Sequence, residues 1–115
     1  MARSNLENTA WVLGRSMAAD SYSSVIDLRD TGQANGIVQV SWSGFDAPNG
    51  SFELQVTHVE ARGWAKLCDP IAVTKPADCE VFLVNFPGLV LMRLAFFKGA
   101  GTAGSFDASY FLKGY

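Results

Sequence analysis

Two segments in the middle of the chain show a clear alternation of apolar and polar residues. They are residues 37–45 and residues 51–58, separated by the turn sequence Asp-Ala-Pro-Asn-Gly at 46–50. The apolar members are Val38, Val40 and Trp42 in the first segment and Phe52, Leu54 and Val56 in the second. A period of two residues is typical of a strand with one buried face. The pattern therefore predicts two strands that pair as a β-hairpin across the Asn-Gly turn.

The last quarter of the chain contains two further segments of this kind, residues 89–97 and 105–113, separated by glycines and small residues. They predict a closing β-hairpin with a long glycine loop. The first of them is apolar on both faces: Val90, Met92, Leu94 and Phe96 form one face, and Leu89, Leu91, Ala95 and Phe97 surround Arg93 on the other. Since a strand with two apolar faces is buried on both, the second face needs a cover. Residues 1–9 or another subunit could supply it.

The remaining segments are short. Residues 9–20 fit either a helical face or a strand, and the glycine at position 14 together with the strand-rich surroundings favours a strand. Further short strands are predicted in residues 22–30, 64–68, 71–74 and 79–86. About eight short strands without a long helix predict an all-β fold, a single antiparallel jelly-roll-like β-sandwich over residues 1–115. Residues 1–9 are expected to form an extended arm.

Composition narrows the function classes. The chain has 115 residues, a net charge of −2 and only 17% charged residues, against about 25% in typical soluble domains. It has no basic cluster for nucleic acid, no apolar run of membrane-spanning length and no apolar core of a signal peptide. We therefore expect no nucleic acid or membrane partner. The low charge indicates either a surface covered by neighbours or an outer face of uncharged polar residues.

The candidate chemical motifs are weak. Cys68 and Cys79, with the lone His58, are too few for a zinc site, and we expect free, buried thiols and no cofactor. The glycines at 99, 101 and 104 match a dinucleotide-binding spacing, but the motif requires a helix after it, and a strand is predicted there. The sequence Asn-Gly-Ser at 49–51 is a glycosylation signal that is better explained as a turn.

No catalytic residue can be identified, and we expect a protein that is not an enzyme. The carboxylates are scattered singly along the chain, and His58 has no partner in a recognisable motif. A glycosidase pair formed by folding stays open at this point. Of the three tryptophans, Trp42 lies on an apolar face, whereas Trp11 and Trp64 could stack on sugars. A carbohydrate-binding β-sandwich is therefore an alternative of another class.

The chain resembles the small β-sandwich virion proteins of tailed bacteriophages, which include capsid cement (decoration) proteins and head or tail accessory proteins. The resemblance lies in residues 23–28, 36–44, 47–67 and 90–114. It differs at 58–63, where comparable proteins often carry a Ser-Asn-Asp-like turn before the tryptophan. The resemblance implies a structural protein of the virion, assembled in the host cytoplasm. Its partners would be the major capsid protein or other virion proteins, and it would form a homo-oligomer such as a trimer.

In this interpretation the protein stabilises the phage head by bridging capsid subunits, with a tail or head–tail connector component as the alternative. The interface candidates are the outward apolar residues of the closing segments, Leu89, Leu91, Phe97 and Phe111, together with residues 1–9. Ordinary core packing is the competing explanation for these side chains.

Overall fold

The computed structural model describes residues 5–29, 34–86 and 90–114, and within them it contains ten strands and one 3-10 turn. The long strands are β1 (Asn5–Ser16), β4 (Ala34–Ser43), β5 (Gly50–Thr57), β8 (Asp78–Phe86), β9 (Leu91–Phe97) and β10 (Ser105–Gly114). The short ones are β2 (Ser21–Tyr22), β3 (Ile26–Asp27), β6 (Ala65–Lys66) and β7 (Ile71–Val73), and η1 (Glu60–Arg62) is the 3-10 turn.

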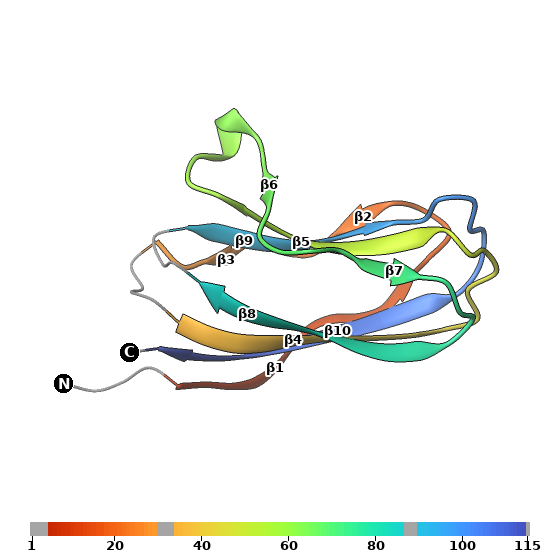
Figure 1. The fold of residues 1–115 in the computed structure, drawn as a ribbon, viewed down its shortest axis with the longest axis horizontal. Coiled ribbons are helices and arrows are strands. Elements are labelled where there is room, and N and C mark those ends of the chain that lie inside the picture. Colours follow the sequence, from red (N-terminus) through yellow and green to blue (C-terminus); the bar gives the residue numbers. More distant parts are fainter. Residues whose placement is uncertain (1–4, 30–33, 87–89, 115) are drawn as a thin grey trace.

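The strands form two antiparallel sheets that pack face to face (Figure 1). Sheet A has the order β1-β10-β4-β8, and sheet B has the order β2-β9-β5-β6, with β3 beside β9 and β7 beside β5. If β2 and β3 are counted as one interrupted strand, and β6 and β7 as another, each sheet has four strands in the order of a jelly roll. The predicted antiparallel β-sandwich is confirmed.

Both predicted hairpins are wrong. β4 pairs with β10 and β8, whereas β5 pairs with β9 in the other sheet. In the same way, β9 belongs to sheet B and β10 to sheet A. The loops at 44–49 and 98–104 carry the chain from one sheet to the other. Alternation reports which face of a strand is buried but not which strand is its neighbour, so the faces were predicted correctly and the partners were not.

The N-terminal part of the chain also differs from expectation. Residues 9–20 were ambiguous, and the structure places most of them in strand β1, which excludes the helix. β1 begins at Asn5, so residues 5–9 of the predicted extended arm lie in a strand that pairs with β10, and the first four residues lie outside the described part. The strand predicted for residues 22–30 is interrupted: residues 22–29 contain the last residue of β2 and the whole of β3, each of which pairs briefly with β9.

An aromatic cluster fills the space between the sheets. Phe52 from sheet B lies with its ring centroid 5.0 Å from both Phe96 and Phe106, and 5.6 Å from Trp42. Phe96 belongs to sheet B, whereas Phe106 and Trp42 belong to sheet A. The indole nitrogen of Trp42 donates to the carbonyl of Lys75, 2.9 Å away, so its polar group is satisfied inside the core. The predicted core role of Trp42 is confirmed.

The outer face of sheet B is covered by its own chain. Arg93 points outward, because its neighbours Met92 and Leu94 are buried in the core. Its guanidinium carbon lies 4.0 Å from the ring centroid of Tyr22 and 4.3 Å from that of Trp64. These two aromatic side chains lie over the part of the face around Arg93, for which residues 1–9 or another subunit were the predicted covers, and Tyr22 is itself 47% exposed.

The glycine loop at 98–104 is held by side chains of neighbouring loops. Oδ1 of Asp46 accepts hydrogen bonds from the backbone nitrogens of Thr102 and Ala103 at 2.7 and 3.2 Å, and Oδ2 accepts from the Thr102 hydroxyl. Asn49 accepts from Ala100 and Asp20 accepts from Lys98. Two hydrogen bonds from Thr102 hold the pKa of Asp46 below its usual value. The bond from the hydroxyl has the larger effect and the bond from the backbone nitrogen the smaller one.

This pKa shift predicts a loss of stability in acid. Because the folded protein favours the ionised carboxyl, the unfolded chain binds more protons, and stability falls as the pH drops below about 4 and through the folded pKa of Asp46. Asp46→Asn should lack this part of the pH dependence when denaturant unfolding is followed between about pH 2 and pH 7. In Thr102→Val, an NMR titration should show the Asp46 pKa closer to its usual value. Identical pH profiles for the Asp46→Asn variant and the parent would contradict the assignment.

Candidate functional site on the outer face of sheet A

The outer face of sheet A exposes more large apolar side chains than that of sheet B, where Tyr22 is 47% exposed. Eight large hydrophobic residues of the described chain are well exposed. Five of them lie on this face: Leu13, Ile37, Val81, Leu83 and Phe111. Clusters of this kind on a small protein mark surfaces that bind partners. The face is therefore the strongest candidate for a functional site.

Four of these residues form one apolar patch, which consists of Ile37, Val81, Leu83 and Phe111. On neighbouring strands, Phe111 lies opposite Ile37, and Ile37 lies opposite Leu83. Val81 is two residues from Leu83 on β8 and therefore on the same side of the sheet. The exposed fractions are 42% for Phe111, 43% for Ile37, 46% for Val81 and 73% for Leu83. The patch crosses three of the four strands and ends at the edge strand β8.

The described part of this face carries little charge. Among the described side chains that point outward from β10, β4 and β8, Asp107 is the only ionisable carboxylate or base. Its Oδ1 accepts a hydrogen bond from the backbone nitrogen of Gly14, 2.5 Å away. The other polar groups are serines, Gln39, Asn35 and Asn85. A neutral face costs little to desolvate, which suits it to burial against another protein surface.

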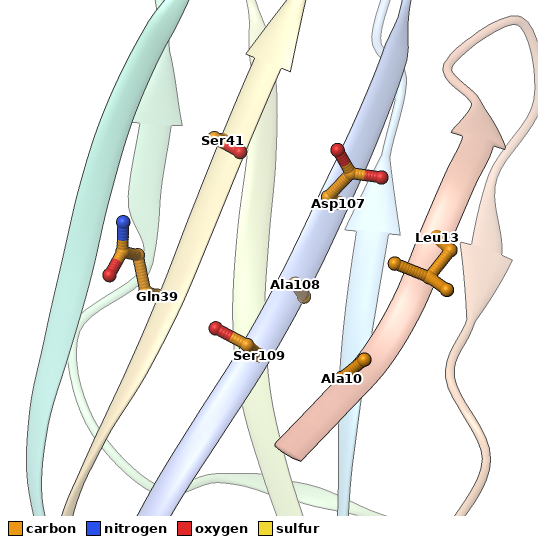
Figure 2. A pocket seen from close by; sticks show the side chains of 7 residues that line it. All are labelled: Ala10, Leu13, Gln39, Ser41, Asp107, Ala108 and Ser109. Carbon is orange, nitrogen blue, oxygen red and sulfur yellow. The ribbon is translucent and has the colours of Figure 1, made fainter. Parts of the chain in front are cut away.

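Next to the patch lies a shallow furrow with a volume of about 240 Å³ (Figure 2). Its lining comes from β1, β10 and β4: Ala10, Leu13, Gln39, Ser41, Asp107, Ala108 and Ser109. The furrow follows the part of β1 where the pairing with β10 is irregular, between Ala10 and Arg15. There Gly14 adopts a φ of 57°, which glycine tolerates better than other residues.

The structure distributes the predicted interface residues unevenly. Phe111 belongs to the apolar patch. Leu91 is only 5% exposed and Phe97 is half-buried on the covered face of sheet B, so Leu91 offers little surface to a partner. Leu89 lies outside the described residues.

Most of the patch was not predicted from the sequence, although signals for it were present. Ile37 is an apolar residue at an outward position of an otherwise polar strand face. Val81 and Leu83 belong to the run Val-Phe-Leu-Val, which is apolar on both faces of β8. Apolar residues at outward positions were recognised as interface candidates in the closing segments, residues 89–97 and 105–113, but not in β4 or β8.

The tryptophans do not form an exposed platform for sugars. Trp11 is half-buried, packs edge-to-face on Tyr110 at 5.5 Å and donates its indole hydrogen to the carbonyl of Ser24 at 2.9 Å. Trp64 is half-buried against Arg93. Stacking on a glycan would compete with these contacts.

The cysteines and carboxylates show no reactive arrangement in the parts of the chain that the structure describes. Cys68 and Cys79 are both free thiols, as predicted, but Cys79 is exposed rather than buried. Burial, and secondly the charge of Asp69, raises the pKa of the Cys68 thiol, which disfavours the nucleophilic thiolate. Hydrogen bonds from Arg29 lower the pKa of Asp27 to about 2. Residues 5–29, 34–86 and 90–114 contain no cluster of three metal-ligating side chains.

The chain matches no protein-family model and no curated protein sequence. The described segments also contain no helix that is long and apolar enough to span a membrane.

Proposed function

We propose that the protein is a non-enzymatic structural component of a phage virion that stabilises the capsid by bridging its subunits. The outer face of sheet A is the surface that would be buried against the major capsid protein or another virion protein. This proposal combines the resemblance found in the sequence with the arrangement of this face. Jelly rolls are common in viral capsid proteins and in lectins, although a fold by itself does not define a function.

The apolar patch is the observation that carries the proposal. It gathers Ile37, Val81, Leu83 and Phe111 on a face where Asp107 is the single carboxylate among the described outward side chains of β10, β4 and β8. A monomer without a partner would gain solubility from charged residues at these positions. Repetition on a symmetric particle multiplies a modest contact, so that even a patch of this size can hold neighbouring subunits together.

The test is binding of the purified protein to capsids assembled without it. We expect saturable binding with a fixed number of copies per capsid, and capsids that resist heat or dilution better when the protein is bound. Light scattering gives the mass of the free protein, and sedimentation with capsids gives the bound fraction. Protein that remains in the supernatant at all concentrations would contradict the proposal. The copy number per virion distinguishes a head cement protein from a tail or head–tail connector component.

The furrow favours a carbohydrate-binding role as a second candidate. Its amide, hydroxyl and carboxylate groups, from Gln39, Ser41, Ser109 and Asp107, are of the kind that bind sugar hydroxyls. Glycan-induced shifts confined to the NMR signals of these residues would support this candidate. Under the virion proposal, glycans leave these signals unchanged.

A further inference from the structure

The edges of the two sheets differ in how well they are protected against pairing with another chain. Sheet B ends on strands of two or three residues, β2 and β3 on one side and β6 and β7 on the other. In sheet A, β1 is long, but its pairing with β10 is interrupted by three register shifts. Short strands and bulges are known devices that prevent strand addition. Three of the four edges are therefore protected.

The fourth edge, β8, lacks these devices. It has nine residues, Asp78–Phe86, and pairs with β4 in continuous register from Trp42 opposite Asp78 to Ala34 opposite Phe86. It contains no proline and no lysine. Its outward side chains Val81 and Leu83 are 46% and 73% exposed. Its charges, Asp78 and Glu80, are confined to its first three residues. β8 thus presents a regular row of backbone donors and acceptors beside an apolar surface.

We propose that β8 pairs with β8 of a second copy of this chain, antiparallel about a twofold axis, to form one continuous eight-stranded sheet. The inference does not depend on the virion role. The pairing that uses all nine residues places Phe82 on the axis. On the outer face, Val81 of one copy then lies opposite Leu83 of the other, so the two apolar patches join across the dimer.

The position of the acidic residues favours this antiparallel arrangement. In the pairing about Phe82, Glu80 lies opposite Val84, and the two Glu80 residues are four positions apart, about 13 Å along the strand. Charges at this distance are largely screened at physiological salt, where the Debye length is about 8 Å. A parallel arrangement would place the two Asp78 and the two Glu80 residues side by side, where like charges repel.

The size of the contact also fits a second copy. A nine-residue strand is about 30 Å long, and the edge of a two-layer sandwich is about 20 Å deep with its side chains. The contact therefore covers about 600 Å² on each copy, or about 1,200 Å² in total, at the lower limit for a specific dimer. We expect a dimer that dissociates at low concentration.

The first test compares two leucines of nearly equal exposure at opposite edges of sheet A. Leu83 on β8 is 73% exposed and Leu13 on β1 is 76% exposed. Leu83→Lys should raise the dimer dissociation constant about 30-fold or more, because each dimer loses two buried leucines. Leu13→Lys should change it less than about twofold. Analytical ultracentrifugation at protein concentrations from about 1 to 100 μM measures the dissociation constants of both variants. If Leu83→Lys fails to fold, Val81→Lys takes its place. A monomeric parent protein, or equal effects of the two lysines, would overturn the proposal.

The second test measures the geometry directly. Cys79 is exposed and lies three residues from the proposed axis, and Cys68→Ser leaves it as the only thiol to label. Pairing about Phe82 separates the two Cys79 Cα atoms by six positions, about 20 Å. Pulsed electron paramagnetic resonance on spin labels at Cys79 should give a distance near this value, extended by the label arms, that disappears in Leu83→Lys. A dimer whose label distance persists in Leu83→Lys would place the interface elsewhere and overturn the proposal.

Discussion

Replacement of Phe52 by alanine is expected to lower the free energy of unfolding by about 3–5 kcal/mol. Phe52 is 0% exposed and contacts aromatic rings of both sheets, Phe96, Phe106 and Trp42. The alanine removes the apolar burial and leaves a cavity between two sheets that are held in place by their own strands, so collapse around it is restricted. Since domains of this size are stable by about 5–15 kcal/mol, the variant should lose a large part of its total stability in urea unfolding.

The matched control is Leu83→Ala, in which a large side chain is also truncated on a strand. Leu83 is 73% exposed, so we expect a change within about 0.5 kcal/mol under conditions where the protein is monomeric. Equal losses in the two variants would mean that the aromatic cluster does not hold the sheets together. A smaller loss for Phe52→Ala, near 1 kcal/mol, would mean that the neighbouring rings can close the cavity.

The double variant Ile37→Ser with Phe111→Ser is expected to weaken capsid binding about 100-fold or more while the protein stays folded. The two residues are cross-strand neighbours within the patch, 43% and 42% exposed. Loss of two apolar side chains from a buried interface centre typically costs several kcal/mol of binding energy, and about 1.4 kcal/mol corresponds to a factor of ten. Sedimentation with capsids measures the binding, and circular dichroism checks the fold.

A control with the same chemistry lies elsewhere on the surface. Val25 and Val59 are 42% and 47% exposed and do not belong to sheet A. The double variant Val25→Ser with Val59→Ser should bind capsids as the parent does. If it loses as much affinity as the Ile37 and Phe111 variant, binding depends on general surface hydrophobicity, and the assignment of the site to sheet A fails.

The alternation of apolar residues predicted the strands and their buried faces well. Val38, Val40 and Trp42 are buried in β4, and Phe52 and Leu54 are buried in β5, as expected. The alternation of apolar and polar residues in a strand depends on which face packs on the other sheet, and it can be recognised from the residues of that strand alone. The neighbouring strand is set by where the connecting loop goes.

The loop at 44–49 shows why the neighbours were not predictable. A short loop with Asn-Gly usually makes a hairpin, but here Phe45 is buried at 3% exposure and its backbone nitrogen donates to Pro76. The burial of one aromatic side chain turns the chain across the sandwich, and its partners come from residues 76 and 96–101, far along the sequence. Such contacts leave no signal in the loop itself.

The candidate site was predictable only in part, for a related reason. An apolar residue such as Phe111 can be recognised as outward-facing within its strand. Whether it is covered depends on side chains from other elements, as Tyr22 and Trp64 cover the face around Arg93. The sequence therefore indicated that apolar outer faces exist, and the structure shows which of the two sheets leaves its face open.

The position of β10 between β1 and β4 has a consequence for how the protein is made. β1 and β4 lie on opposite sides of β10 in sheet A, and all three contribute to the core. Since ribosomes add roughly 5–20 residues per second, β1 and β4 emerge seconds before the strand that joins them. Sheet A closes only when residues 105–114 are available, so this layer cannot be completed before β10 has been synthesised. Until then both strands expose apolar residues, and the nascent chain depends on fast completion or on chaperones to avoid aggregation.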